Sequence, residues 1–412
     1  MDPHFKGDAL TPDFDLIVVG AGPAGSMAAY TAATAGLRVL LLDKSNFPRM
    51  KPCGGGLTIK ALNLLPFSIS EILESATGTL LMGYKYNPPI RYETRGFICG
   101  FVVREVFDNF LFNKALEAGA QFQKITSLDH IQPDDHGVCV QVDGGTELRA
   151  TYLVAADGAN SQCRRLLNPR VEFSRGFALE GIVPYDALSG IPDMEFDFGC
   201  VDYGYGWIFP KKGHANVGIY TCNPDVKLSK DLLRTYLQTK LGTDRIDNVV
   251  GFPLGFGGQT YSQGHDRVLF AGDAVGMAEP LLGEGLHNAL KTGISAGESV
   301  ARAITENIPI GTAYSAKIGS VKSDILRCRN LAFNFFYPRL DTSARNIMKF
   351  PLVESVLMRG FSAGLTLSAT MNQFPVVPFK SPVAPNSLSK IQNQNHQSDS
   401  KTDKSQKLVI AD

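Results

Sequence analysis

The chain has 412 residues, of which 44% are hydrophobic, and its 40 basic side chains balance its 40 acidic ones. This length allows one large domain or two to three ordinary ones, with enough apolar residues for a core. A net charge of zero argues against a nucleic-acid binder, which would carry a basic excess. The seven cysteines are scattered without a CxxC pair. We therefore expect no disulfide framework and no metal site, and a reducing, cytoplasmic compartment.

The N-terminal residues 1–12 are polar and lack the apolar stretch of a signal peptide. No run of about 18 apolar residues occurs, so we expect no transmembrane helix. Peripheral membrane contact stays open, because it can rest on apolar surface alone. From Lys380 onward the chain is rich in Ser, Asn, Gln and Lys without an aromatic residue. Residues 377–412 are therefore expected to form a disordered tail.

Residues 14–43 show the pattern of a strand, a glycine-rich turn, a small-residue helix and a second strand that ends in an acid. In a GxGxxG turn the first glycine permits the tight turn, the second lets backbone approach a pyrophosphate, and the third brings helix and strand together. Asp43 lies 21 residues after Gly22, a spacing typical of a ribose-binding acid. The alternative is a tight turn in an unrelated α/β domain. The expected dinucleotide contacts are Gly20, Gly22, Pro23, Ala24, Gly25, Asp43 and Lys44.

The later elements follow from apolar periodicity and from turn residues. Up to residue 156 we expect a Pro- and Gly-rich loop over 44–58, a short helix over Ile59–Leu65, strands over 78–103, a helix over Arg104–Gly119 and short strands over 120–156. Beyond it we expect strands over 170–222, helices over Lys230–Leu241 and Gly283–Ile304, and a mostly helical chain over 309–370.

Three apolar strands each end in a polar turn, at Gly20, at Asp157-Gly158 and at Gly272-Asp273. Ligands of open α/β sheets bind beyond the carboxyl ends of strands, so these turns should converge on one ligand. Taken alone, Asp157-Gly158 is a common turn and Asp273 could be a helix N-cap. Together they predict a Rossmann-like α/β domain in separated segments, an inserted antiparallel-sheet domain and a C-terminal helical region. The expected limits are 1–75, 98–170 and 262–308 for the dinucleotide domain, 76–97 and 171–261 for the substrate domain, 309–376 for the helical region, and 377–412 for the tail.

This order of GxGxxG, DG and GD turns resembles the FAD-dependent oxidoreductases of the p-hydroxybenzoate hydroxylase type. The resemblance implies that Asp273 contacts the ribityl or pyrophosphate region of FAD. It also implies that Asp157-Gly158 shapes the approach to the flavin and that Arg104 lies beside it. The alternative for Arg104 is a solvated residue at a helix start.

Three further motifs are similar to those of the geranylgeranyl reductase family, and together they cover residues 14 to about 305. They are the loop Pro48–Gly56, the strand Gly204–Lys211 with its Tyr-x-Trp-x-Phe-Pro pattern, and Gly272–Gly276 followed by Pro280–Leu286. The resemblance implies an isoprenoid or lipid-linked substrate and places Cys53 by flavin and substrate. It adds flavin contacts at Cys53, Gly54, Gly55, Gly272, Gly283, Gly285 and Leu286.

Alternation along a strand puts Tyr205, Trp207 and Phe209 on one face. That face could cover an apolar substrate, or it could be a core aromatic cluster. Cys53 could be a small packed hydrophobe, or a group that positions the substrate or assists proton delivery. We expect Cys53, Tyr205 and Trp207 to be the catalytic residues, and His287 to be packed or solvent-bridging rather than catalytic.

The leading functional hypothesis is an FAD-dependent reductase that saturates double bonds of a geranylgeranyl-type chain, with NADPH or another donor such as ferredoxin. The alternatives are an FAD-dependent monooxygenase of an aromatic or lipophilic substrate, and a flavin-binding scaffold without activity. Leu331–Tyr337 is rich in aromatic residues, and apolar side chains recur at helical spacing after it. This region either packs on the dinucleotide domain or forms a membrane-facing mouth. The apolar side chains at helical spacing are Phe350, Val353, Val356, Leu357 and Phe361.

Overall fold

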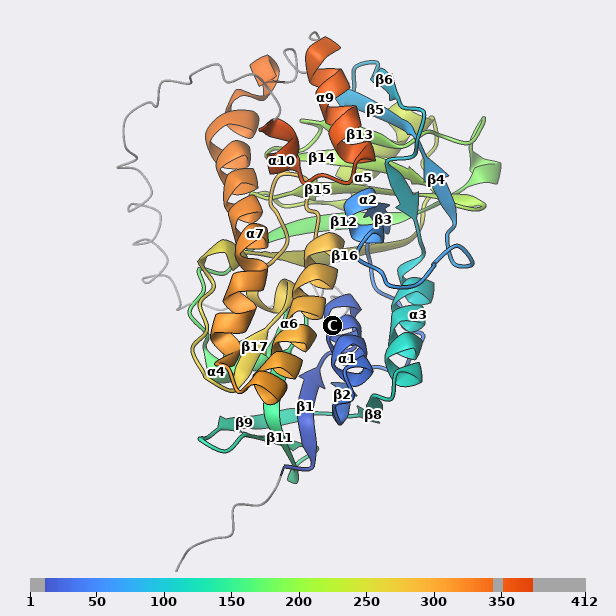
Figure 1. The fold of residues 1–412 in the computed structure, drawn as a ribbon. Helices are drawn as coiled ribbons and strands as arrows, with labels where there is room; N and C mark the ends of the chain where they lie inside the picture. Colours follow the sequence, from blue (N-terminus) through green and yellow to red (C-terminus); the bar gives the residue numbers. More distant parts are fainter. Residues whose placement is uncertain (1–11, 344–350, 373–412) are drawn as a thin grey trace, which may run out of the picture.

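The computed structural model describes residues 12–343 and 351–372, so the predicted tail over 377–412 lies outside the described residues. Two seven-stranded sheets and one three-stranded sheet make up the β-structure of this part of the chain. In Figure 1 the first large sheet lies at the bottom of the view and the second at the top, with long helices on the near side. The predicted fold class, an α/β protein with a Rossmann-like part, a second sheet and a C-terminal helical region, is confirmed.

The first sheet has the order β8-β2-β1-β11-β10-β9, and β17 also pairs with β11. β1 runs parallel to β2 and β11, and β17 runs parallel to β11. The register pairs Val19 with Ala155, and Ala155 with Phe270, so the three predicted turns leave the same sheet edge side by side. The bounds are β1 Phe14–Val19, β2 Val39–Asp43, β8 Gln121–Lys124, β9 Leu128–Pro133, β10 Val138–Val142, β11 Thr146–Ala155 and β17 Val268–Phe270.

Helix α1 packs between α3 and α6 in front of this sheet (Figure 1). Small residues allow a close approach: a Cβ on Gly293 of α6 would lie 2.1 Å from the carbonyl oxygen of Ala24 in α1. The strand side chains beneath them, from Leu16 to Val19, are almost completely buried. The helices here are α1 Pro23–Thr34, α3 Arg104–Glu117, α4 Gln162–Leu167, α6 Leu286–Glu306 and α7 Ile310–Asn330.

The second sheet has the order β16-β12-β15-β14-β13-β5-β6, and its neighbours are antiparallel except for the parallel pair β13 and β5. Helix α5, Lys230–Leu241, covers one face and buries Leu233, Tyr236 and Leu237. The other face carries aromatic side chains. The bounds are β5 Thr79–Tyr84, β6 Ile90–Glu93, β12 Ser174–Pro184, β13 Glu195–Phe198, β14 Gly204–Pro210, β15 His214–Thr221 and β16 Asp247–Phe256.

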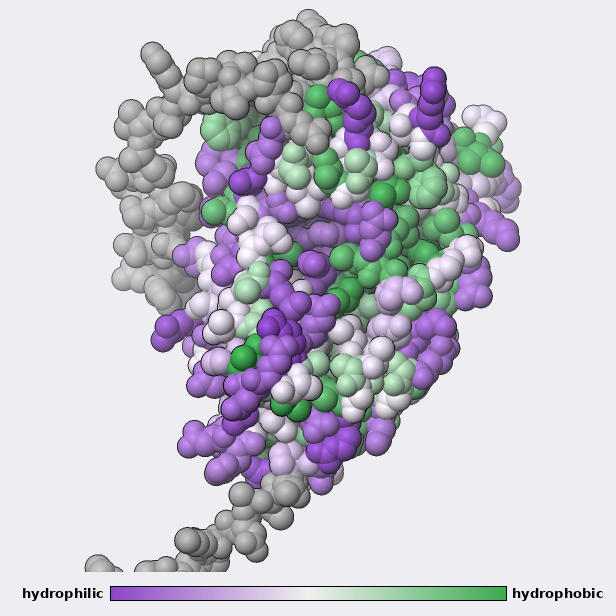
Figure 2. Space-filling view, in the orientation of Figure 1, coloured by the Kyte–Doolittle hydropathy of each residue, from purple (hydrophilic) through white to green (hydrophobic). Residues whose placement is uncertain are grey.

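The third sheet has the order β3-β7-β4, and both of its strand pairs are antiparallel. Its strands are β3 Gly56–Thr58, β4 Ser75–Thr77 and β7 Cys99–Phe101, and α2 covers Ile59–Leu62. Half-buried apolar residues pack around α2 and α3, including Leu65, Phe67 and Phe110. Figure 2 shows apolar surface between these two helices, beside a polar band over α6.

The C-terminal region is helical, as predicted. α7 continues as a π-helical segment, Leu331–Phe336, and is followed by α9 Pro351–Ser362 and α10 Leu367–Met371. Ala332, Phe336 and Tyr337 are buried against the aromatic face of the second sheet. The segment is therefore packed, but on the second sheet and not on the dinucleotide domain as the packing alternative had it. No helix among the described residues is both long enough and apolar enough to cross a membrane. Phe350 and the side chain of Val353 lie outside the described part, and membrane contact stays a prediction.

Several predicted boundaries are wrong by a few residues. α2 ends at Leu62 instead of Leu65, and α3 ends at Glu117, two residues before the predicted end. α6 begins at Leu286 instead of Gly283, because the preceding turn is held by the carboxylate of Glu279. The stretch 78–103 contains three strands that belong to two different sheets. The predicted domain limits stay predictions.

Candidate active site

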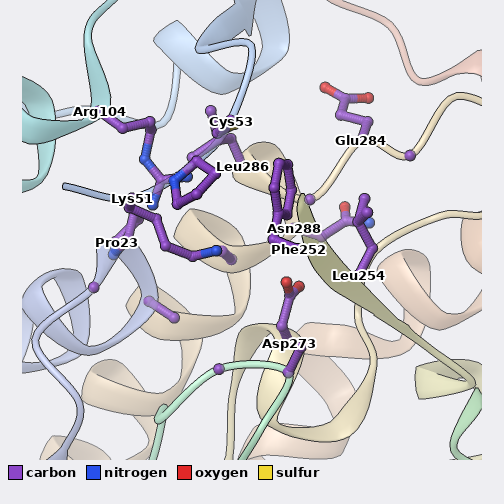
Figure 3. A pocket seen from close by; sticks show the side chains of 18 of the residues that line it. Pro23, Lys51, Cys53, Arg104, Phe252, Leu254, Asp273, Glu284, Leu286 and Asn288 are labelled. Atoms are coloured by element: carbon purple, nitrogen blue, oxygen red, sulfur yellow. The ribbon is translucent and has the colours of Figure 1, made fainter. Parts of the chain in front are cut away.

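A cavity of about 620 Å³ is lined by residues from both large sheets (Figure 3). This volume is within the usual range of ligand pockets, about 300–1,000 Å³. It brings together most of the predicted site residues, while Gly25 and Gly272 lie outside its lining. The predicted residues that line it are Gly20, Gly22, Pro23, Ala24, Asp43, Lys44, Cys53, Gly54, Gly55, Arg104, Asp157, Tyr205, Trp207, Asp273, Gly283, Gly285 and Leu286.

The glycine turn after β1 is built as the sequence predicts. Gly20 has φ +100°, and a Cβ there would lie 2.5 Å from the carbonyl oxygen of Ala156. A Cβ on Gly25 would lie 1.7 Å from the carbonyl oxygen of Gly20, so α1 can pack this closely only with glycine. Gly22 is the N-cap of α1 without a capping side chain. The first N–H groups of α1 are therefore available to an anionic group at the cavity wall.

Asp43 stands at the end of β2 on the cavity wall. Its Oδ2 accepts a hydrogen bond from the backbone N–H of Ala21 at 2.7 Å, and Oδ1 accepts one from Ser45 at 2.8 Å. The carboxylate thus ties the end of the second strand to the glycine turn. This position matches that of a ribose-binding acid in a dinucleotide fold.

Asp157 and Asp273 have different surroundings. The Asp157 carboxylate accepts hydrogen bonds from the Ser161 hydroxyl at 2.5 Å and the Cys163 N–H at 2.9 Å, so it holds the start of α4. The Asp273 side chain has no hydrogen bond from the described residues and lines the cavity. It is not the N-cap of α6, a position that Gly285 takes.

Charges gather around Asp273. Burial raises the pKa of this carboxyl above 3.8, against the attraction of the cations Lys51, Arg104 and Arg164. In Figure 3 the Lys51 side chain extends across the cavity toward Asp273. Burial lowers the pKa of Lys51, and its Nζ lies 4.8 Å from the centre of the Phe252 ring. A carboxylate without a hydrogen-bond donor, opposite a cation, is an unfilled acceptor for ligand hydroxyls.

Arg104 begins α3 and is buried, so the alternative of a solvated helix start is wrong. Its Nε and Nη2 donate to the carboxylate of Asp108 at 2.7 and 2.9 Å, and Arg49 approaches the same carboxylate at 3.2 Å. Burial disfavours the charge on Arg104, but Asp108 outweighs it and raises the pKa of the guanidinium. The ion pair between Arg49 and Asp108 connects the loop that carries Arg49 to α3.

The loop Gly54–Gly56 lies against the aromatic face of the second sheet. A Cβ on Gly54 would lie 2.7 Å from the Phe209 ring and 3.2 Å from Nε1 of Trp207. Gly55 has φ +71°, and a Cβ there would lie 2.0 Å from the carbonyl oxygen of Val102. Any side chain at these two positions would collide with the strand or with the Val102 backbone, so only glycines let the loop lie this close.

Tyr205, Trp207 and Phe209 all line the cavity, from one face of β14. Tyr205 and Trp207 are also buried. The same face is therefore both an aromatic core cluster and part of the cavity wall. The Tyr205 hydroxyl donates to the carbonyl oxygen of Leu282, and Trp207 Nε1–H donates to Oδ1 of Asn216 at 2.8 Å. Both polar tips are therefore satisfied by the protein, which leaves the rings as an apolar wall.

The turn before α6 is held by two acids that the sequence reasoning missed. The buried Glu279 carboxylate accepts the N–H groups of Leu281 and Leu282, each at 2.8 Å. Glu284 pairs with Lys60 at 2.5 Å and accepts from the Thr58 hydroxyl at 2.8 Å. In the sequence, the position of Glu279 directly before the Pro-Leu-Leu-Gly turn could have indicated that it holds this turn. His287 hydrogen-bonds to Asn288 at 2.9 Å and lies outside the cavity lining, as expected of a packed residue.

Apolar side chains from distant segments close another part of the cavity. They come from β5, the segment before β13, β13 itself, and the chain at and after α9. Sequence periodicity could not place them together, because they come from three parts of the chain that are more than 100 residues apart. The residues are Leu80, Met194, Phe196, Phe361, Leu365 and Leu367.

Comparisons with known proteins identify relatives of this chain. The family model of an FAD binding domain matches residues 13–184. A digeranylgeranylglycerophospholipid reductase of Methanopyrus kandleri is 33% identical over 322 residues, which are 72% of this chain and 82% of the relative. A geranylgeranyl diphosphate reductase of Rhodobacter capsulatus is 34% identical over 69% of this chain and 74% of the relative.

Solved structures show the same fold. A geranylgeranyl bacteriochlorophyll reductase-like protein of Thermoplasma acidophilum superposes with a TM-score of 0.64 at 21% identity, over 87% of this chain and 95% of that protein. A flavin-dependent brominase superposes with a TM-score of 0.66 at 18% identity, over 87% of this chain and 97% of that protein. At these identities the likeness concerns the fold alone.

Proposed function

This chain belongs to the geranylgeranyl reductase family of FAD-dependent oxidoreductases, and on that premise we propose that it saturates carbon–carbon double bonds of an isoprenoid, geranylgeranyl-type chain. The observation that carries the proposal is the cavity itself. A dinucleotide turn, a glycine-lined loop and an apolar aromatic wall line one space of about 620 Å³. A flavin and a prenyl chain need these three surfaces at once.

The residues of the cavity fit FAD. The N-terminus of α1 suits a pyrophosphate and Asp43 suits a ribose. The Asp273 carboxylate lacks a hydrogen-bond donor among the described residues and suits a ligand hydroxyl. Gly54 and Gly55 line the cavity, and the lack of a Cβ lets their loop lie directly against the Phe209 ring and the Val102 backbone. When bound and reduced, FAD supplies the hydride for the double bond.

The remaining work falls to residues of the chain. Tyr205 and Trp207 offer an apolar face that holds a prenyl chain and excludes water. Saturation of a double bond also needs a proton at the second carbon, and Cys53 lies in the cavity wall beside that face. We assign Cys53 to positioning the substrate or to assisting proton delivery. The electron donor, NADPH or ferredoxin, is left open.

Replacement of Cys53 tests this assignment. We expect Cys53→Ala to keep FAD and to lower turnover by about 100-fold, the usual contribution of a positioned proton donor. Cys139→Ala is the matched control, because Cys139 is also half-buried but lies on β10 away from the cavity. Equal turnover of the two variants would remove Cys53 from the mechanism.

Product analysis separates the two enzyme classes. The purified protein, reduced under air with geranylgeranyl diphosphate, should give a product that gains two hydrogens for each reduced bond. Oxygen uptake should not rise in proportion to product. A product that gains an oxygen atom, with matching oxygen uptake, would instead establish the monooxygenase alternative.

A further inference from the structure

A buried carboxylate connects the second sheet to the loop that carries Cys53. Glu180 lies in the middle of β12 and is 5% exposed. Its Oε1 accepts a hydrogen bond from the backbone N–H of Cys53 at 2.7 Å. The two residues are 127 positions apart in the sequence, so this contact joins two separate parts of the chain.

Glu180 stands on the same face of the sheet as the aromatic wall. Residue 178, two positions before it, lines the cavity, and alternate residues of a strand share a face. Across the sheet Glu180 pairs with Gly218, which in turn pairs with Trp207. A Cβ on Gly218 would lie 2.3 Å from the Trp207 ring, so the indole occupies the space over this glycine. Glu180 therefore fixes the Cys53 loop relative to the strand that carries Trp207.

A buried cation, Lys211, attracts the carboxylate of Glu180. Lys211 follows β14, is 6% exposed, and its Nζ would lie 3.2 Å from a Cβ on Gly55. Burial raises the pKa of Glu180 to about 6, while Lys211, the Cys53 N–H and Asn216 lower it. Burial likewise lowers the pKa of Lys211 against the attraction of Glu180. Oε2 of Glu180 is buried without a hydrogen bond from the described residues.

Such a carboxylate is expensive to bury, because its desolvation is only partly offset. A glutamine or an apolar residue would hold the sheet together at lower cost. The charge strengthens the hydrogen bond from the Cys53 N–H, since hydrogen bonds to ionised acceptors are roughly twice as strong as neutral ones.

We propose that Glu180 is a positioning residue for Cys53, acting through the hydrogen bond that its carboxylate accepts from the Cys53 N–H. Glu180 holds the backbone of Cys53, and with it the thiol, at a fixed place against the aromatic wall. The effect of a Glu180 substitution on turnover rests on the proposed function, whereas its effect on the order of the loop is independent of that function.

The test compares Glu180→Leu, which removes the acceptor, with Glu180→Gln, which keeps an acceptor without the charge. Glu195→Gln is the matched control. Glu195 is equally buried in the same sheet, but its carboxylate pairs with Lys240 of α5 at 2.5 Å, and it does not line the cavity. Each FAD-loaded protein is examined by hydrogen exchange of the peptide covering residues 50–56, and by kcat and KM for prenyl reduction.

We expect Glu180→Leu to speed exchange of this peptide about 10-fold or more and to lower kcat by a similar factor, with KM changed less. Glu180→Gln should restore most of the protection and most of kcat. Glu195→Gln should leave both at the wild-type level. If Glu180→Leu fails to fold, Glu180→Gln decides: exchange faster than in Glu195→Gln by about 2-fold to 5-fold supports the proposal.

Wild-type exchange in the peptide of either Glu180 variant overturns the proposal. So does an equal rise in Glu195→Gln, because the loop would then report general damage to the sheet. If the wild-type protein reduces no prenyl chain, the proposed function fails while the exchange result still decides the role of Glu180.

Discussion

At the scale of single residues, the site contains side chains that accept hydrogen bonds from the backbone and are also expected to contact a ligand. Asp43 is the clearest case, since its two oxygens hold the N–H groups of Ala21 and Ser45. Asp273 is the opposite case: no side chain or N–H of the described residues donates a hydrogen bond to its carboxylate, which cations including Lys51 and Arg104 attract. An acid such as Asp43 shapes the cavity wall, whereas an acid such as Asp273 can accept a hydrogen bond from a ligand.

Replacement of Asp43 should weaken FAD binding. Asp43→Ala leaves the Ala21 N–H without its acceptor and removes the expected ribose contact. We expect a loss of about 1–3 kcal/mol, or roughly 10-fold to 100-fold in Kd, measured by titration of the apoprotein with FAD. Asp15→Ala is the control, because Asp15 pairs with Arg38 at the opposite end of β1. An unchanged Kd in Asp43→Ala would contradict the assignment.

Residue spacing predicted part of this site. Gly20, Gly22, Gly25 and Asp43 belong to one local strand–helix–strand unit, so their distances along the chain fix their places in space. Glu180 could not be found in this way. Its partner is 127 residues away, and a lone acid in an apolar strand carries no local pattern.

At the scale of elements, α1 and α6 determine how the three turns meet. Gly293 lets α6 lie on the backbone of α1, and Gly297 does the same one turn later, with a Cβ 2.6 Å from the carbonyl oxygen of Ala28. This contact sets where the N-terminus of α6 meets the cavity. Helix propensity alone would favour alanine at both positions.

A pair of alanine substitutions separates packing from propensity. Gly293→Ala should lower the free energy of unfolding by about 1–3 kcal/mol, because its Cβ collides with the Ala24 backbone. Gly319→Ala in α7 has no atom within 4 Å of the new Cβ and should raise it by about 0.5–1 kcal/mol. Urea unfolding of both variants gives the comparison. A stabilised Gly293→Ala would show that α1 and α6 are not packed this closely.

Element types were predicted better than their partners. The helix over Lys230–Leu241 has the predicted bounds, because Ser229 caps its start and Gly242 ends it with φ +68°. The strands over 78–103 were predicted as one group, yet β7 pairs with β3 and β5 pairs with β13. Pairing depends on contacts far along the chain, which alternation does not report.

At the scale of the whole molecule, stability and function draw on separate buried charges. The second sheet buries Glu195 and Asp197 with Lys240 on the face covered by α5. It carries Glu180 on the cavity face. The two faces should therefore respond independently to substitution.

The buried acids on the sheet face covered by α5 should make the free energy of unfolding depend on pH. Burial raises the pKa of Asp197 from 3.8 to about 6, against Lys240 and together with Glu195. An acid whose folded-state pKa is raised ionises more readily in the unfolded chain. Its contribution is therefore full below about pH 4 and is lost as the pH rises through about 6.

Asp197→Asn removes this pH-dependent contribution to the free energy of unfolding. The stability of the variant relative to wild type should rise between about pH 5 and about pH 7.5, by on the order of 1 kcal/mol. Urea unfolding at both pH values measures it. Asp186→Asn, at an exposed ion pair with Arg245, should show little change. A relative stability that falls with pH would reverse the sign and contradict this account of the cluster.

The central claim is that this cavity couples a bound flavin to a prenyl double bond. The most direct measurement is anaerobic: the flavin of the purified protein is reduced chemically, geranylgeranyl diphosphate is added, and the flavin absorbance is followed over seconds to minutes, as expected for turnover. We predict reoxidation without oxygen and a saturated product by mass spectrometry. A flavin that stays reduced with geranylgeranyl diphosphate and with lipid-linked geranylgeranyl chains, and reoxidises only when oxygen is admitted, would contradict the claim.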